Sequence, residues 1–330
     1  MSPATGIGSL PGGDAEAYAE AVRMVLGELP EMPYLPELPG RGPQADMTGR
    51  ALAIVTELGA DLQPAGWRLT DRPGIDQRRA RSLLAQDLDA LEEQSQGYQG
   101  RLKIQVAGPW TLAATVERPR GDRILADHGA RRELAQALAA GLTDHVADVR
   151  RRVPGAEIVV QVDEPALPAV MAARIPTASG LGRHRSVDAP AASPPLEWVF
   201  GAIAAAGATP VAHCCAADAP LSLLTGAGAR GVSVDLAQLS AAAYDVVGGL
   251  IEKGQLVFLG VVPTAAPDPR PSDRALTEKV LRLLDMLGFD QESAEASLVI
   301  TPACGLAGAS PDWARQAMVL SRLVAANLAT

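Results

Sequence analysis

The sequence predicts an α/β fold, organised as a single (β/α)8 TIM barrel. Short β-rich runs, many ending in Pro or Gly, alternate with longer Ala-, Leu-, Arg- and Glu-rich segments of helical period. About eight β-rich runs occur, near residues 4, 33, 101, 156, 208, 231, 255 and 297. Eight βα units in 330 residues favour a barrel, with an open doubly wound sheet as the alternative. We therefore expect residues 1–330 to form one domain.

The N-terminal part of the chain contains the first two β-rich runs and an extension. ATGIGSLPGG predicts a short strand and a Gly-rich loop, and Asp14 is a plausible N-cap for a helix over 14–29. MPYLPELPG is a second extended segment, and apolar residues at helical spacing predict a helix over 45–58. Residues 61–72 are ambiguous. We expect this N-terminal extension to form a hairpin or another element outside the core.

The rest of the chain repeats the βα pattern more regularly. Helices are predicted over 77–98, 131–153, 197–206, 241–253, 272–287 and 311–328. Strands are predicted in RLKIQVAGPW, AEIVVQVDEPAL, ATPVAHCC, GVSVDL, QLVFLGVVP and SLVITPACGL. The segment 174–195 is rich in Gly, Pro, Ser and Ala, so we expect a lid-like loop there.

The bulk composition argues against a nucleic-acid or membrane partner. A net charge of −9 and a pI near 5.0 provide no positive surface for a phosphate backbone. The first residues lack the basic-then-apolar pattern of a secretory signal, and no apolar run reaches the ~18 residues of a membrane span. We expect a soluble, cytoplasmic protein.

Polar residues follow nearly every predicted strand. They are Ser9, Glu37, Asp163, Glu164, His213, Cys214, Cys215, Asp235, Thr264 and Cys304. In barrels of this kind, catalytic groups lie where strands end and βα loops begin. The pattern therefore indicates an active site rather than core packing.

Three of these residues predict a metal site. On a strand, residues i and i+2 project to the same side, so His213 and Cys215 can converge on one ion while Cys214 points away. Cys304, at the end of the last strand, can reach the same point across the barrel mouth. Zinc favours thiolate and imidazole ligands. The alternative is that these cysteines only pack as small hydrophobic residues.

The sequence leaves alternative roles open for the carboxylates. Asp163 and Glu164 point in opposite directions in a strand, so one is expected to face the barrel mouth and the other to cap or pair structurally. Asp235 is a metal ligand, a partner that orients His213, or the N-cap of the next helix. His184 in the 174–195 segment is structural or solvated, with a contact to substrate as the alternative.

Four motifs in order resemble one family over essentially the whole chain. IGSLP, QVDEPAL, the H-x-C of His213 and Cys215, and PACGL resemble the C-terminal catalytic barrel of cobalamin-independent methionine synthase, within the wider uroporphyrinogen decarboxylase and methionine synthase-like superfamily. The resemblance implies a methyltransferase that transfers a methyl group to the thiol of homocysteine and yields methionine. It also implies a Zn²⁺ cofactor.

The resemblance assigns roles to particular residues. It implies that His213, Cys215 and Cys304 bind zinc, with Asp235 at the position of the family's fourth ligand, a Glu. It further implies that Ile7, Gly8 and Ser9 hold the substrate carboxylate through backbone amides and the serine hydroxyl. Asp163 is expected to hold the substrate ammonium, with Glu37 as a second acidic partner. No catalytic group beyond the metal site is implied.

Two departures from the family concern the methyl donor. The family's His after the seventh strand is missing, because the run reads GVVPTAAP with Thr264, and the N-terminal barrel of the full-length enzymes has no counterpart here. The donor is therefore methyltetrahydrofolate or a methyl-corrinoid protein, and the two departures favour the methyl-corrinoid protein. The alternatives are a uroporphyrinogen decarboxylase-like enzyme, a corrinoid-dependent methyltransferase with another substrate, and a non-catalytic thiol- or metal-binding barrel.

Overall fold

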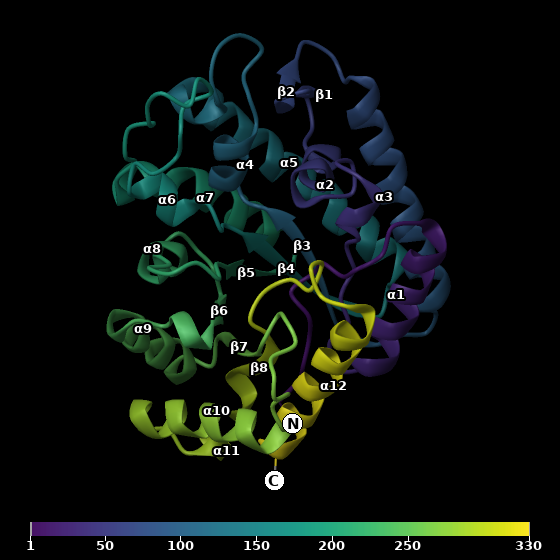
Figure 1. The fold of residues 1–330 in the computed structure, drawn as a ribbon, viewed down its shortest axis with the longest axis vertical. Helices are drawn as coiled ribbons and strands as arrows, with labels where there is room; N and C mark the ends of the chain where they lie inside the picture. Colours follow the sequence, from purple (N-terminus) through teal and green to yellow (C-terminus); the bar gives the residue numbers. More distant parts are fainter. Residues whose placement is uncertain (1, 330) are drawn as a thin grey trace.

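A curled sheet of six parallel strands lies at the centre of the molecule (Figure 1). The computed structural model describes residues 2–329, and in it the strands pair in sequence order from β3 to β8. Their bounds are β3 Gly100–Ala107, β4 Ala156–Asp163, β5 Thr209–His213, β6 Gly231–Asp235, β7 Leu256–Val262 and β8 Leu298–Pro302. The strands are apolar and almost wholly buried, as expected for a parallel sheet covered on both faces.

Two extended N-terminal segments close the sheet into a barrel. The closure consists of parallel bridges between Ala4 and Ile300, Ser9 and Glu37, and Tyr34 and Lys103. The segments near residues 4 and 33 thus take the places of the first two barrel strands, and all eight predicted runs lie in one barrel. They form single bridges rather than longer ladders because Pro3, Pro33 and Pro36 supply no N–H groups.

Helices surround the barrel (Figure 1). The α-helices are α1 Ala15–Glu28, α2 Met47–Ile54, α3 Ile75–Gln94, α4 Pro109–Thr115, α5 His128–Arg152, α6 Leu167–Met171, α7 Ala189–Ala205, α8 Leu221–Gly226, α9 Ala241–Glu252, α10 Asp273–Leu287, α11 Gln291–Ala294 and α12 Pro311–Asn327. Short 3-10 helices are η1 Pro39–Arg41, η2 Ile124–Ala126, η3 Leu236–Gln238 and η4 Glu295–Ser297. Among residues 2–329, no helix combines the length and hydrophobicity needed to cross a bilayer.

The ambiguous segment near residues 61–72 forms a hairpin outside the barrel, as expected. Strands β1 Gly59–Gln63 and β2 Gly66–Thr70 pair antiparallel, and Trp67 and Leu69 bury the inner face of the second strand. This extension does not precede the barrel, because Ala4 already pairs with β8. It lies between the second and third barrel strands.

The expected loop over 174–195 is shorter than predicted. Helix α7 already begins at Ala189, where the side chain of Asp188 accepts a hydrogen bond from the Ala191 amide. Pro190 fits the first turn, which needs no intrahelical donor there, and Pro194 and Pro195 lie inside the helix. The composition alone therefore overestimated the length of the loop, which spans residues 172–188.

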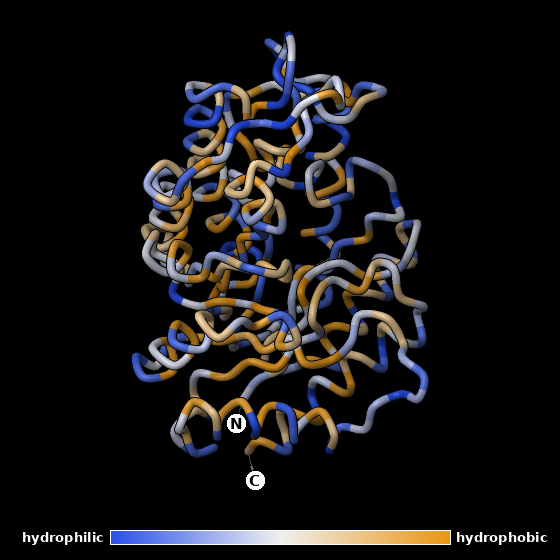
Figure 2. Tube along the Cα trace, turned by 60° about the vertical axis from the view of Figure 1, so that its left-hand side comes forward, coloured by the Kyte–Doolittle hydropathy of each residue, from blue (hydrophilic) through white to orange (hydrophobic). Residues whose placement is uncertain are grey.

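The barrel interior has an apolar layer and a polar layer. Met32, Val159, Val211, Phe258 and Val299 form a closed hydrophobic cluster. Towards the carboxyl ends of the strands, buried polar side chains replace them: Lys103, Gln105, Gln161, Asp163, His213 and Ser233. Figure 2 shows hydrophobic segments running through the interior and hydrophilic ones concentrated at the periphery. The polar layer is the part of the interior that faces the site.

Candidate active site

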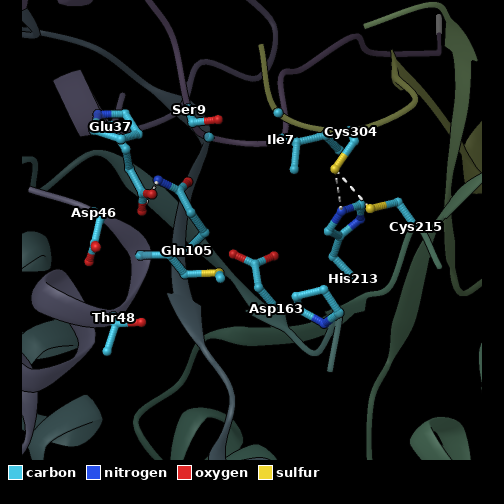
Figure 3. Close-up of a pocket in the computed structure, with 15 residues that line it drawn as sticks. Ile7, Ser9, Glu37, Asp46, Thr48, Gln105, Asp163, His213, Cys215 and Cys304 are labelled. Atoms are coloured by element: carbon cyan, nitrogen blue, oxygen red, sulfur yellow. Dashed lines mark hydrogen bonds between the residues drawn. The ribbon is translucent and has the colours of Figure 1, made fainter. Parts of the chain in front are cut away.

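A cavity of about 390 Å³ lies at the carboxyl ends of the barrel strands (Figure 3). Among its lining residues are Ile7, Gly8, Ser9, Glu37, Asp163, His213, Cys215 and Cys304. Every site residue predicted from the sequence except Asp235 therefore lines one cavity. No residue of the 174–195 segment is among the lining residues, so its role as a lid stays a prediction.

Three soft ligand atoms converge on one side of this cavity. The Nε2 atom of His213 and the Sγ atoms of Cys215 and Cys304 lie within 4.8 Å of one another. The two Sγ atoms are 2.8 Å apart, and Sγ of Cys304 is 3.9 Å from Nε2 of His213 (Figure 3). The cysteines are free thiols, since a disulfide bond is only about 2.05 Å long. The group fits a single metal ion.

The orientation of the His213 ring is set by the neighbouring strand β6. Its Nδ1 atom lies 3.0 Å from Oγ and 3.2 Å from the carbonyl oxygen of Ser233. Because Nδ1 is engaged by Ser233, Nε2 is the ring nitrogen that faces Cys304. Metal-binding histidines are typically held by such a hydrogen bond on the other ring nitrogen.

Cys214 points away from the cluster, as strand geometry predicted. Its side chain is buried, and it lines a small separate cavity beside Asp218 and Leu221. Burial raises the pKa of the Cys214 thiol to about 11, so it stays protonated. Cys214 therefore packs in the interior, while its neighbours His213 and Cys215 face the pocket.

The two facing thiols differ in their acidity. The hydrogen bond with Cys215 lowers the pKa of the Cys304 thiol to about 4, and His213 acts in the same direction. The same hydrogen bond, together with burial, raises the pKa of Cys215. Cys304 is therefore the more acidic thiol of the pair. A thiolate is the form that binds a metal.

Asp235 does not join this group in the structure. Its Oδ1 atom accepts a hydrogen bond from the Ala237 amide at 2.9 Å, which caps η3. The residue lines a neighbouring cavity of about 640 Å³ that also contains Thr264. Burial raises the pKa of the Asp235 carboxyl group. Its role as a fourth ligand stays a prediction.

The adjacent carboxylates Asp163 and Glu164 have separate roles, as their strand positions predicted. Asp163 faces the cavity, and burial raises the pKa of its carboxyl group to about 7, while His213 opposes this shift. Glu164 caps α4, where it accepts hydrogen bonds from the amide of Trp110 and from the amide and hydroxyl of Thr111. Only Asp163 is available to a ligand in the cavity.

The Ile7–Ser9 segment runs along one wall of the pocket, with Ile7 beside Cys304 and Ser9 further towards Glu37 (Figure 3). Within residues 2–329, the amide groups of Ile7, Gly8 and Ser9 donate to no other group. A Cβ atom on Gly8 would come within 2.9 Å of Gln105, and one on Gly305 within 2.1 Å of Ser9 Oγ. Glycine at both positions therefore lets the segment approach β3 and the loop after β8.

Glu37 is held in the pocket by a chain of charged groups. It accepts a hydrogen bond from Gln105 at 3.0 Å and lies 3.3 Å from Nε of Arg50. Asp87 then joins Arg50 to Arg41 through ion pairs of 2.5 and 2.8 Å. All five side chains are buried or nearly so. This network fixes the Glu37 carboxylate before any ligand binds.

Some lining residues were missed by sequence reasoning. Asp46, Thr48 and Gln105 also face the cavity. Asp46 is the N-cap of α2, accepting from the Gly49 amide at 2.7 Å. An N-cap carboxylate directly after the second barrel strand was the available signal for Asp46. The sequence carried no such signal for Gln105, because its position at the cavity wall depends on closure of the barrel.

These features define an α/β-barrel enzyme whose active site lies at the carboxyl ends of the strands and includes a candidate thiolate–imidazole metal centre. The family model described as the catalytic domain of cobalamin-independent synthase matches residues 93–327. The chain belongs to this family, which confirms the sequence-based recognition and the expected methyltransferase class. The matched region includes Asp163, His213, Cys215 and Cys304, whereas Ile7–Ser9 and Glu37 precede it.

Solved structures extend the fold comparison to the whole chain. A B12-independent methionine synthase from Shewanella sp. W3-18-1, in complex with selenomethionine, is 13% identical with a TM-score of 0.64. The match covers 100% of this chain and 98% of that one. A β-galactosidase from Marinomonas ef1 is 11% identical, with a TM-score of 0.48 over 99% of this chain and 59% of that one, too low to bear on function. A comparison with curated proteins finds no match.

Proposed function

We propose that this protein transfers a methyl group to the thiol of homocysteine and forms methionine, with zinc bound by His213, Cys215 and Cys304. One observation carries the proposal. A single cavity combines a cluster of soft metal ligands with a separate set of amide donors and carboxylates. Such a cavity matches an amino acid that has a thiol at one end and two charged groups at the other.

The donor set fits zinc. Two thiols and an imidazole are ligands that zinc prefers, and catalytic zinc sites have three protein ligands and an open position. Bound there, zinc would lower the pKa of a coordinating substrate thiol and so supply the nucleophile. Asp235 is proposed as an additional ligand; its Oδ1 atom accepts from the Ala237 amide, which leaves Oδ2 to coordinate.

The charged end of the substrate has matching groups elsewhere in the same cavity. The unpaired amides of Ile7, Gly8 and Ser9 suit the α-carboxylate, and Ser9 adds a hydroxyl. Asp163 and Glu37 suit the ammonium group. Asp163 is buried, so a bound cation would favour its ionised form. These contacts would orient homocysteine with its sulfur towards the metal ligands.

The proposed donor is methyltetrahydrofolate. The methyl-corrinoid donor expected from the sequence is at odds with membership of a cobalamin-independent family, so it is not retained. In the transfer, the sulfur–carbon bond forms as the donor's nitrogen–carbon bond breaks. The electron pair stays on the donor nitrogen, which then takes a proton. Since GVVPTAAP contains no His, we propose that solvent supplies this proton.

The direct test is formation of methionine by the full chain. Protein purified with reductant and zinc would be incubated with homocysteine and methyltetrahydrofolate, and methionine would be measured by mass spectrometry. We expect zinc-dependent product, and much slower product formation from the Asp163→Asn variant at limiting homocysteine. Zinc-loaded protein that binds neither homocysteine nor methionine would refute the proposed function.

A further inference from the structure

A lysine is completely buried behind the wall of the cavity. Lys103 in β3 has 0% exposure and does not line the pocket. Its Nζ atom donates to the carbonyl oxygen of Ile7 at 2.8 Å and to Oε1 of Gln105 at 3.1 Å, and it lies 5.3 Å from the centre of the Tyr34 ring. Burying an ammonium group costs several kcal/mol, so its retention here calls for a compensating role.

A second buried side chain shares the same acceptor. Gln161 in β4 is 0% exposed, and its Nε2 atom donates to the Ile7 carbonyl at 2.9 Å and to Oδ1 of Asp163 at 2.7 Å. The Ile7 carbonyl thus accepts two hydrogen bonds from the barrel interior. While both hydrogen bonds are formed, the plane of the Ile7–Gly8 peptide has a fixed orientation.

This arrangement determines where the Gly8 amide points. In a trans peptide, the N–H group lies opposite the preceding carbonyl. The Ile7 carbonyl points into the barrel interior, towards Lys103 and Gln161. The N–H group of Gly8 therefore points in the opposite direction, towards the pocket that Gly8 lines. Gly8 also packs directly on Gln105, which leaves no room for a side chain.

The same two side chains also reach the carboxylates of the pocket. Gln161 holds Asp163, and Lys103 contacts Gln105, whose Nε2 atom donates to Glu37 at 3.0 Å and to the Leu35 carbonyl at 2.7 Å. Burial lowers the pKa of Lys103, while the Asp163 and Glu37 carboxylates favour its charged form. The carboxylate-binding amides and the ammonium-binding acids therefore share one buried support.

We infer that Lys103 and Gln161 are positioning residues. They hold the carboxylate-binding amides and the ammonium-binding carboxylates of the amino-acid pocket in fixed relative positions. They orient the Ile7–Gly8 peptide and the Asp163 and Glu37 carboxylates without touching the ligand. This inference rests on the proposed function. It assigns to Lys103 an effect on recognition of the amino-acid group and none on the metal or the thiol.

The test uses zinc-loaded full chain and the variants Lys103→Met and Gln161→Met, which keep side-chain length but remove the donors. Calorimetry would measure binding of L-methionine and of 1-propanethiol, which lacks both charged groups. We expect the affinity for methionine to fall about 10-fold or more in each variant, as for loss of buried charge-assisted hydrogen bonds. Zinc content and propanethiol affinity should stay at wild-type values, and KM for homocysteine should rise with little change in kcat.

A matched control is available in α3. Gln77 is also 0% exposed, and its Nε2 atom donates to the carbonyl oxygens of Leu52 and Leu58 at 2.9 and 3.0 Å. The Gln77→Met variant loses a similar buried amide but should bind methionine normally. If Lys103→Met does not fold, Gln161→Met carries the test alone.

The possible outcomes separate the two proposals. Wild-type methionine affinity in the Lys103 and Gln161 variants, with binding lost in Asp163→Asn, overturns the positioning role and leaves the proposed function standing. Wild-type affinity in all three, Asp163→Asn included, overturns the proposed amino-acid site itself. Equal losses for methionine and propanethiol indicate general damage to the pocket and also overturn the positioning role.

Discussion

The two sides of the pocket differ in how far their polar groups are satisfied within the chain. On the amino-acid side, Glu37 and Asp163 each accept a hydrogen bond from a buried glutamine. On the metal side, the thiols of Cys215 and Cys304 contact each other and His213, and Asp235 is engaged by its own helix. The first side is preorganised by protein contacts, while the second would gain stabilisation from the proposed ion.

The largest expected effect concerns the metal side. Cys304→Ser should lower zinc affinity by more than the ~10–100-fold typical of losing a ligand's hydrogen-bond partner, because a ligand itself is removed. Metal analysis under reducing conditions should find about one zinc per chain in the wild type and far less in the variant. Cys214→Ser is the adjacent control, since that side chain is buried away from the cluster. Equal zinc content in both variants would contradict the proposed metal centre.

The next effect concerns the amino-acid side. Asp163→Asn keeps the shape of the side chain but removes the charge that would pair with the substrate ammonium, so methionine affinity should fall about 10–100-fold. Calorimetry with zinc-loaded protein measures this. Glu164→Gln, which alters the cap of α4 and not the pocket, should lower stability and leave affinity near wild type. The reverse ranking of the two variants would contradict the assignment of Asp163.

A smaller effect tests whether Asp235 is the fourth zinc ligand on the metal side. Asp235→Asn retains an oxygen that can cap η3 through the Ala237 amide but loses the negative charge. We expect zinc affinity to fall about 10-fold, as measured by competition with a chelator. An unchanged zinc affinity would show that Asp235 acts only as the cap of η3. The metal side would then have only three protein ligands.

A last effect is on stability rather than on binding, and it concerns His145, whose pKa is influenced by the Arg50 that pairs with Glu37. Burial, with Arg50 in the same direction, lowers the pKa of His145 from 6.5 to about 4. Because the folded state then binds fewer protons than the unfolded state, stability should decrease as the pH falls from about 6.5 towards 4, by at most about 3 kcal/mol. Urea unfolding at pH 7.5 and 4.5 measures the loss. His145→Gln should show a smaller difference between the two pH values, and an equal difference would exclude His145 as a cause.

Local patterns were sufficient for much of the fold and for part of the site. Eight β-rich runs predicted the barrel, and the i, i+2 rule placed His213 and Cys215 on one side and Cys214 on the other. The same alternation separated Asp163 from Glu164. Each of these outcomes depends on the period of a strand, which is readable from neighbouring residues.

Local capping contacts and contacts between distant segments decided the rest. The start of α7 inside a Pro-rich stretch and the capping contact of Asp235 depend on local competition for hydrogen bonds that composition does not reveal. In RLKIQVAGPW, Lys103 and Gln105 resemble solvent-facing positions of a strand, and their sequence carries no sign of burial. They become interior only because residues 4–9 and 34–37 close the barrel over them. The sequence by itself therefore determined the barrel and its candidate soft metal ligands. The tertiary structure decided which buried groups support the proposed amino-acid pocket, since that support exists only where strands distant in sequence meet.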